Sequence, residues 1–318
     1  MYMQKSIAEA TVGHIGSRQA RVEDAALLQG QGRYADDMAT PPGTLQAAVV
    51  RSPHAHARIR SGDASRALTM KGVHGVLTGD DVKRWSNPFP VGVRAPMEHW
   101  PLAVDKVRYV GEPVCVVSNV VNERNFRYGD PERAFAEAPH RITLKVQYPR
   151  NSCTPIECYV VLAQYLPASE TYDVMANFQG PYALHSVMCR ALNVPANRLR
   201  LRTPPDSGGS FGIKQGVFPY VVLMGLASRK VGAPVKWVED RLEHLQASSS
   251  ATNRVCEIEA AVEANGRVTA LRYDQIDDCG AYLRAPEPAT FYRMHGNLSG
   301  AYTIRNLAVR NRVVLTNK

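Results

Sequence analysis

The sequence predicts an α+β fold divided into two domains. Short strand-like and helix-like segments alternate along the chain, which is typical of mixed layers of helix and sheet. The chain has 318 residues, and single hydrophobic cores stop growing at roughly 250–300 residues, so two domains are expected. A polar, turn-rich segment at 129–139 separates two runs of predicted strands. We therefore expect a tail over 1–18, a first domain over 19–129 and a second domain over 130–318.

The first domain is predicted from short segments of both kinds. Helical patterns lie within 18–37, over 63–69 with Asp63 as the N-cap, and from Gly79 onwards. Strand patterns cover 44–50, 57–59, 73–78, 107–111 and 114–117.

The second domain has longer and more regular patterns. Helices are predicted over 181–192 and 217–230, and strands over 141–148, 160–165, 171–176, 199–203, 235–239, 254–263, 267–277 and 306–315. The pair Asn265-Gly266 suits a two-residue hairpin loop, because both residues tolerate positive φ. The last strand stops three residues before Lys318, so we expect an incomplete domain. A sheet edge protected by Arg310, Arg312 and Lys318 is the alternative.

The composition is that of a folded protein with a moderate basic excess. Hydrophobic residues make up 45% of the chain, and 38 Lys and Arg against 29 Asp and Glu give a net charge of +9. The sequence has no polybasic run and no nucleic-acid recognition motif with interleaved aromatic residues, so we expect no nucleic-acid binding. An anionic cofactor or an acidic partner chain explains the charge better.

Targeting signals and cysteine motifs are missing from the sequence. The first 16 residues lack the apolar core of a secretory leader. The longest apolar run, Val217–Ala227, is shorter than the roughly 18 residues that a membrane span needs. The six cysteines form no Cys-x-x-Cys pair, so we expect reduced thiols and no zinc or iron–sulfur site on this chain. A cytoplasmic protein without a membrane span is expected.

The most informative segment joins a predicted strand to a long predicted helix through Gly208, Gly209 and Gly212. Glycines at such a junction let backbone N–H groups approach an anion, and the following helix N-terminus favours negative charge. The spacing matches neither a P-loop nor a dinucleotide fingerprint. The segment is therefore either an anion or cofactor loop or a tight structural turn.

A second segment, Gln179-Gly180-Pro181, ends one predicted strand and opens a helix. At the carboxyl end of a strand, the primary amide of Gln179 can donate hydrogen bonds to an oxo or carbonyl group. A glutamine whose hydrogen bonds are satisfied within its own turn is the alternative.

Together, these segments resemble the molybdenum-cofactor-binding large subunit of the xanthine oxidase family. The order of Gln-Gly-Pro at 179–181, the connection at 192–200 and Gly-Gly-Ser-Phe-Gly-Ile-Lys at 208–214 carries the resemblance. It is strongest to the bacterial carbon monoxide dehydrogenase-like large subunits. The segments 16–24, 32–37, 50–57 and 110–114 resemble the hammerhead domain of that family.

The resemblance implies a hammerhead-type α/β domain followed by the first part of a molybdopterin-binding α+β domain. It implies molybdenum held by molybdopterin, often as the cytosine dinucleotide, that hydroxylates a heteroaromatic or aldehyde carbon with water-derived oxygen. Electrons would leave through [2Fe–2S] clusters and FAD on partner subunits. The expected assembly is a dimer of heterotrimers containing an iron–sulfur subunit and an FAD subunit.

The resemblance also assigns site residues. Gln179 matches the amide near the apical oxo ligand of molybdenum. The first cofactor loop is matched by Gly208, Gly209, Ser210, Phe211 and Gly212, with no direct metal ligand.

Two residues near the loop depart from the family pattern. Ser210 replaces the third glycine of the family loop and adds a hydroxyl near the cofactor. Gln215 is the second departure, because it stands where purine-oxidising members carry a carboxylate, which counts against a purine substrate. The resemblance assigns Phe211 and Gln215 to the substrate pocket.

The second cofactor loop and the glutamate that acts as general base lie beyond residue 318 in the family. Catalysis is therefore expected only with the C-terminal remainder of the large subunit. A truncated, non-catalytic scaffold or cofactor-binding fragment is the alternative.

Weaker candidates have structural alternatives. His54 and His56 lack a third ligand at metal spacing. Glu157 suits acid–base chemistry only if another carboxylate approaches it, and Asp278 is expected to stabilise a turn. The basic segment 284–318 is expected to be a solvated face, with an acidic partner or cofactor phosphates as the alternative.

Overall fold

The computed structural model describes residues 21–54, 56–91, 98–109, 119–251, 253–283 and 298–316. The chain divides into two units, Met1–Arg33 and Tyr34–Lys318. The first unit contains the short helix α1 (Asp24–Leu28). The tail predicted over 1–18 and the strand predicted over 114–117 lie outside the described residues.

The first sheet of the larger unit is mixed and has the strand order β1-β9-β6-β7-β8. Its strands are β1 (Leu45–Gln46), β9 (Val235–Val238), β6 (Val160–Leu166), β7 (Thr171–Ala176) and β8 (Leu199–Arg202). The pairs β1–β9 and β7–β8 are parallel, whereas β6 is antiparallel to both of its neighbours. Because β1 pairs with β9, a strand from the beginning of the chain extends a sheet that is built mainly from residues beyond 159.

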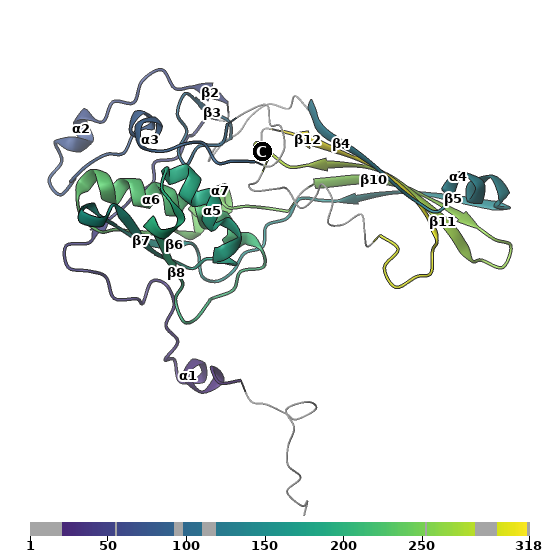
Figure 1. Cartoon of the computed structure of the whole chain (residues 1–318), viewed down its shortest axis with the longest axis horizontal. Coiled ribbons are helices and arrows are strands. Elements are labelled where there is room, and N and C mark those ends of the chain that lie inside the picture. Colours follow the sequence, from purple (N-terminus) through teal and green to yellow (C-terminus); the bar gives the residue numbers. More distant parts are fainter. Residues whose placement is uncertain are drawn as a thin grey trace, which may run out of the picture. The chain divides into compact units, whose positions relative to one another are not determined.

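Two helices, α5 (Pro181–Leu192) and α6 (Phe218–Val231), pack on this sheet (Figure 1). Each has proline in its first turn and ends at a residue with left-handed φ, Asn193 or Gly232, as helix boundaries favour. α5 buries one stripe of side chains, whereas α6 is buried nearly all round. The largest buried apolar side chains here are Trp237, Tyr159, Tyr172, Leu184, Met188, Leu192 and Leu226.

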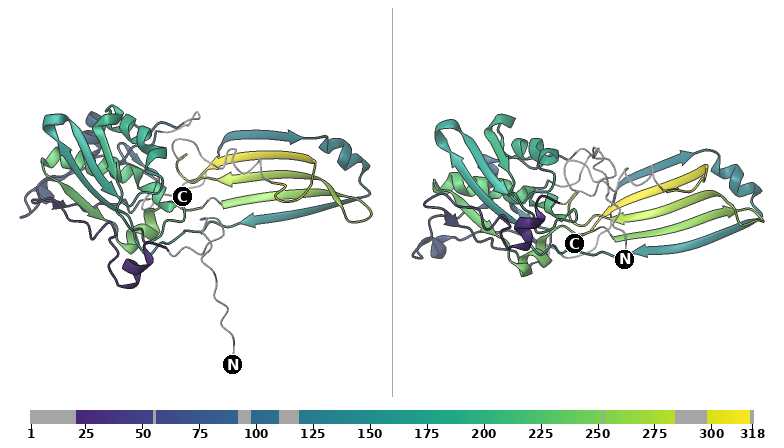
Figure 2. Two further views of the ribbon diagram at one scale, coloured as in Figure 1. Left: turned by 60° about the horizontal axis from the view of Figure 1, so that its bottom comes forward. Right: turned by 90° about the horizontal axis from the view of Figure 1, so that it is seen from below.

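The second sheet has the order β4-β12-β11-β10-β5. Its strands are β4 (Asn119–Tyr128), β12 (Asn306–Leu315), β11 (Val268–Asp278), β10 (Asn253–Val262) and β5 (His140–Tyr148). Figure 2 shows the five strands side by side, with α4 (Pro131–Glu137) at one end of the sheet. Phe135 of α4 packs against Ala261 and Ala270. The strand β12 lies between β4 and β11, so the alternative that its charges protect a sheet edge is wrong.

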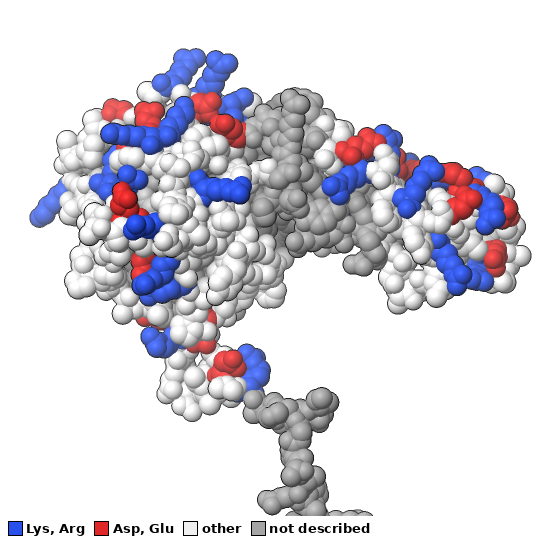
Figure 3. Space-filling model, viewed as in Figure 1, with Lys and Arg blue, Asp and Glu red and all other residues white. Residues whose placement is uncertain are grey.

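Opposite charges meet across this sheet. Arg310 pairs with Glu123 at 2.8 Å, Arg272 pairs with Glu259 at 2.7 Å, and Arg312 pairs with Asp274. Figure 3 shows Lys and Arg side chains interspersed with Asp and Glu over this part of the molecule. On this face the basic excess is therefore not gathered into a single patch.

The remaining described elements are short. Strands β2 (Ala57–Arg58) and β3 (Lys106–Val107) pair with each other. The helices α2 (Ser65–Leu68), α3 (Gly79–Trp85) and α7 (Arg241–Ala247) complete the α-helices, and η1 (Pro167–Ser169), η2 (Ala196–Arg198) and η3 (Ile213–Val217) are 3₁₀ turns. None of the helices in the described ranges is both long and apolar enough to span a membrane.

Several local predictions are wrong. Residues 73–78 form no strand, and Ala64 rather than Asp63 is the N-cap of α2. The Asp63 carboxylate instead accepts a hydrogen bond from the N–H of Ser65. Glu263 and Arg267 still pair across the β10–β11 hairpin, so its loop has three residues, 264–266, instead of the two predicted. Of these three residues, only Gly266 has positive φ.

Candidate functional site

The glycine loop follows β8 and enters α6 through the turn η3. Gly209 and Gly212 have φ of +95° and +89°, in the left-handed region that side chains disfavour. A β-carbon on Gly209 would lie 3.2 Å from both the Phe211 ring and the Pro155 side chain. Backbone conformation and close packing therefore both require glycine at 209.

Phe211 is the unusual residue of this loop. Its φ of 52° is in the left-handed region, and its side chain is 73% exposed. Such a backbone costs roughly 1–2 kcal/mol for a residue with a β-carbon. An exposed ring on strained backbone gains nothing from the protein core, so it favours a role in contacting a ligand.

Gln179 lies directly against this loop. Its Oε1 atom accepts a hydrogen bond from the N–H of Gly212 at 2.9 Å and another from the Ser210 hydroxyl. Because a backbone N–H can only donate, the carbonyl side of the amide must face Gly212. The Nε2 atom, with two donor hydrogens, is then directed away from these two groups.

Gln179 is positioned by the end of β7. Asn177 is buried, accepts the N–H of Val160 at 3.0 Å and donates to the carbonyl of Cys158 at 2.6 Å. The backbone N–H of Gln179 donates to the carbonyl of Lys214. The structure thus brings the predicted amide and the predicted loop together. Gln215 lies nearby, since a β-carbon on Gly180 would be 3.8 Å from its Nε2 atom.

Glu157 holds the glycine loop through hydrogen bonds and an ion pair. Its carboxylate accepts the N–H of Gly208 at 3.0 Å and that of Ala35 at 3.1 Å, and it pairs with the buried Lys214. Its partners are donors rather than a second carboxylate, so the geometry does not form an acid pair. Sequence reasoning did not single out Lys214, although its place two residues after the last loop glycine was the available signal.

Tyr159 holds the end of the same loop. Its hydroxyl donates to the carbonyl of Ile213 at 2.8 Å, and its N–H donates to Glu239 Oε2 at 3.1 Å. Glu239 Oε2 also lies 2.7 Å from His244 Nδ1, and both side chains are fully buried. Burial raises the pKa of the Glu239 carboxyl. These residues, which the sequence did not point to, form a buried hydrogen-bonded support.

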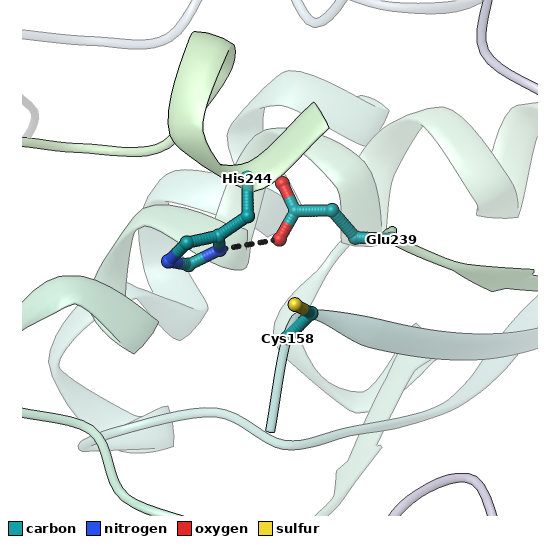
Figure 4. Close-up of side chains that lie close together, drawn as sticks. All are labelled: Cys158, Glu239 and His244. Atoms are coloured by element: carbon teal, nitrogen blue, oxygen red, sulfur yellow. Dashed lines mark hydrogen bonds and ion pairs between the residues drawn. The ribbon is translucent and has the colours of Figure 1, made fainter. Parts of the chain in front are cut away.

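Cys158, Glu239 and His244 offer ligand atoms that all lie within 4.8 Å of one another (Figure 4). Two features of the group disfavour a metal. Glu239 Oε2 already accepts two hydrogen bonds, and Figure 4 shows His244 Nε2 turned away from the other two side chains. The group is a structural support for β6 and α7.

The other candidates lie apart from the loop or have structural roles. His54 is exposed, and burial together with Lys106 and Arg108 lowers the pKa of His56. Neither histidine belongs to a group of three ligands within the described ranges. Asp278 accepts hydrogen bonds from the N–H of Gly280 and the hydroxyl of Thr316, so its predicted turn role is confirmed.

The donors around the loop fit an anionic, oxygen-rich group. Within the part of the chain that the structure describes, the N–H groups of Gly209, Ser210 and Phe211 donate to no backbone or side-chain acceptor, and neither does Gln179 Nε2. Successive backbone N–H groups without an acceptor in a turn are typical of phosphate and cofactor sites. The donor set therefore fits a cofactor that carries phosphate and oxo groups.

Comparison with known proteins supports the same interpretation. The molybdopterin cofactor-binding domain family matches residues 116–318, and the aldehyde oxidase and xanthine dehydrogenase a/b hammerhead domain matches residues 29–123. The chain is 32% identical to the 6-hydroxypseudooxynicotine dehydrogenase complex subunit gamma of Paenarthrobacter nicotinovorans, covering 96% of this chain and 44% of the relative. It is 29% identical to the carbon monoxide dehydrogenase large chain of Hydrogenophaga pseudoflava, covering 98% and 46%.

The fold agrees with these relatives. Quinoline 2-oxidoreductase from Pseudomonas putida 86 superposes with a TM-score of 0.85 at 27% identity, over 96% of this chain and 45% of that chain. The chain thus spans less than half the length of the relatives it matches. On the family matches and the shared fold, the chain belongs to the molybdenum-cofactor-binding large subunits of the xanthine oxidase and carbon monoxide dehydrogenase family, of which it represents the hammerhead domain and part of the molybdopterin-binding domain.

Proposed function

We propose that this chain forms one wall of the molybdenum site in a hydroxylase that acts only as part of a larger complex. The observation that carries the proposal is the contact between the Gln179 amide and the glycine loop. Gln179 Oε1 is held by Gly212 and Ser210, which leaves Nε2 to donate beside the N–H groups of Gly209 and Phe211.

The residues have distinct proposed roles. When bound, the molybdenum cofactor supplies transfer of a water-derived oxygen to an electron-poor carbon and accepts two electrons. The N–H groups of Gly209, Ser210 and Phe211 would hold the cofactor, while Gly208 and Gly212 shape the loop through their hydrogen bonds to Glu157 and Gln179. The Gln179 amide would donate to an oxo group of the cofactor. These donors need little rearrangement when the cofactor binds, because hydrogen bonds to Glu157 and Tyr159 already fix the loop.

The remaining parts of the enzyme are proposed to come from other polypeptide. The general base and the second cofactor loop belong to the C-terminal remainder of the large subunit. An iron–sulfur subunit with [2Fe–2S] clusters and an FAD subunit take the electrons, in a dimer of heterotrimers. The cofactor is proposed to be the cytosine dinucleotide form of molybdopterin.

The proposed substrate is a heteroaromatic compound or an aldehyde. Relatives include proteins named for nicotine and quinoline, which are nitrogen heteroaromatics. The exposed ring of Phe211 offers an apolar surface to such a molecule, and Gln215 offers a neutral amide. A neutral amide does not provide the carboxylate that would anchor a purine.

The native complex, purified under mild conditions, tests this proposal. Molybdenum by elemental analysis and pterin by fluorescence after oxidation are expected in equal amounts per chain. Replacing Gln179 with alanine should lower turnover roughly 100-fold, the effect of losing one preorganised donor. Gln147→Ala, at an exposed position on β5, is the matched control. A complex without molybdenum and pterin would contradict the proposal and favour a non-catalytic scaffold.

A further inference from the structure

We propose that Ser210 is a positioning residue, which holds the Gln179 side-chain amide in one orientation with Nε2 directed at the ligand of the glycine loop. The identity of that ligand rests on the proposed function. The orientation of the amide rests only on hydrogen bonds within this chain.

The choice between the two amide orientations follows from the donors around Gln179. A glutamine amide can be rotated by half a turn with little change of shape, which exchanges its carbonyl and its NH₂ group. The N–H of Gly212 lies 2.9 Å from Oε1 and can only donate. Rotation of the amide would place two donors against each other there, so Gly212 selects the carbonyl.

Ser210 adds a second hydrogen bond to the same carbonyl oxygen. A carbonyl oxygen has two lone pairs, so Ser210 and Gly212 together use its full accepting capacity. Both bonds must break before the amide rotates or the side chain moves off the loop. Ser210 therefore raises the free energy of every alternative position of Gln179.

The backbone explains why a serine is tolerated at this place. Gly209 and Gly212 have left-handed φ angles, but Ser210 is not among the residues with positive φ. A β-carbon at 210 therefore costs no backbone strain, whereas one at 209 or 212 would. A glycine at 210 would satisfy the loop conformation equally well but would leave the Gln179 side chain with a single hydrogen bond to the loop, the one from Gly212.

The consequence concerns Gln179 Nε2. With Oε1 fixed, its two N–H donors keep one direction before any ligand arrives. Preorganised donors stabilise a bound oxo or anionic group more than mobile ones, because no rotation has to be frozen on binding. The serine hydroxyl thus acts through Gln179 and does not itself need to contact the ligand.

Amide hydrogen exchange on the full 318-residue chain tests the inference without cofactor. Three variants are compared with the parent: Ser210→Ala, Ser210→Thr, and Ser207→Ala as an exposed serine control in the same loop. The protection of the Gly212 amide reports on its bond to Gln179. The Gly208 amide, which donates to Glu157, is the internal reference for the stability of the loop.

Ser210→Ala is expected to lower Gly212 protection about fivefold, the equivalent of about 1 kcal/mol for one hydrogen bond, and to leave Gly208 unchanged. Ser210→Thr should restore protection, and Ser207→Ala should have no effect. Unchanged Gly212 protection in Ser210→Ala would overturn the inference. An equal loss at Gly208 and Gly212 would also overturn it, because Ser210 would then stabilise the loop as a whole.

The outcome is distinguishable from that of the proposed function. A native complex without molybdenum would remove the proposed function and leave the exchange result intact. A molybdenum-containing complex combined with unchanged Gly212 protection would remove only the role of Ser210.

Discussion

The buried ammonium of Lys214 forms an ion pair with Glu157 beneath the glycine loop, where the two side chains are 1% and 12% exposed. The same carboxylate accepts the N–H of Gly208, so one acidic side chain connects the beginning of the loop to Lys214, two residues after its last glycine. A buried charge is tolerated only when it is paired and hydrogen-bonded. These contacts within the chain hold the loop in its conformation.

Removal of one member of this pair is expected to destabilise the fold. In Lys214→Met, the Glu157 carboxylate stays buried without its cation, which costs about 3–5 kcal/mol in comparable pairs. Glu157→Gln combined with Lys214→Met should recover part of that loss, since neither charge remains. Urea denaturation of the two single variants and the double variant measures the coupling. A loss below about 0.5 kcal/mol in Lys214→Met, the size of an ordinary surface substitution, would contradict it.

Gly209→Ala is expected to impair cofactor retention specifically. Alanine at φ +95° is strained, and its β-carbon would press on Phe211 and Pro155 at 3.2 Å. Gly232→Ala is the matched control, because Gly232 also has left-handed φ, at +66°, but ends α6 in open space. Both variants should lose about 1–2 kcal/mol of stability from the backbone. Only Gly209→Ala should lower the molybdenum content of the purified complex, and equal molybdenum losses in the two would refute a specific role for the loop.

Stability is expected to rise with pH between about 4 and 6.5 through His99. Burial and the nearby Arg108 lower the pKa of His99 from 6.5 to about 4, and its ring stacks on Tyr282 with centroids 4.3 Å apart. In the unfolded chain His99 is protonated below about pH 6.5, whereas in the folded chain it is protonated only below about pH 4. Between these pH values the unfolded state binds more protons, so acid favours unfolding. The contribution is fully present above 6.5 and amounts to at most about 3 kcal/mol.

The variant His99→Phe keeps an aromatic ring and removes the proton site. Chemical denaturation at several pH values should therefore give a smaller slope of stability against pH for His99→Phe than for the parent. Equal slopes between pH 4 and 6.5 would show that His99 does not contribute.

The parts of the fold that the sequence predicted well have strong local signals. The helix at 181–192 and the strand at 306–315 were predicted with the bounds that α5 and β12 have, because Pro181 starts the helix and apolar residues alternate along the strand. The resemblance assigned both Gln179 and the glycine loop to the cofactor, and the structure brings them into contact, since the two segments come after strands of the first sheet, β7 and β8.

The parts that were missed depend on distant contacts. The polar strand β4, for which no strand was predicted, is stabilised by pairing with β12, almost two hundred residues later in the chain. The helix α4 was missed because Phe135 is its one large apolar side chain and stands among polar residues. The helix α7 was missed because the capping box formed by Asp240 and Glu243 at its start was not recognised. Conversely, the segment at 73–78 pairs with no strand among the residues that the structure describes, and it is irregular. Glu157 and Tyr159, in the loop before β6, and Lys214, in η3, support the site through contacts between distant parts of the sequence, which periodicity does not reveal.

Replacing Phe211 with asparagine is expected to raise the stability of the chain and to lower the activity of the complex. Asparagine adopts left-handed φ more readily than phenylalanine, and the exposed ring contributes little burial, so Phe211→Asn should stabilise the chain by roughly 0.5–1 kcal/mol. The same variant should lower kcat/KM of the complex, because the apolar surface beside the loop is lost. Tyr302→Asn, at a tyrosine that is 77% exposed and has no left-handed φ, controls for removal of an exposed aromatic ring. Thermal denaturation and steady-state kinetics on both variants measure the two effects. A gain in stability without a loss of kcat/KM would mean that the strain at Phe211 serves no ligand.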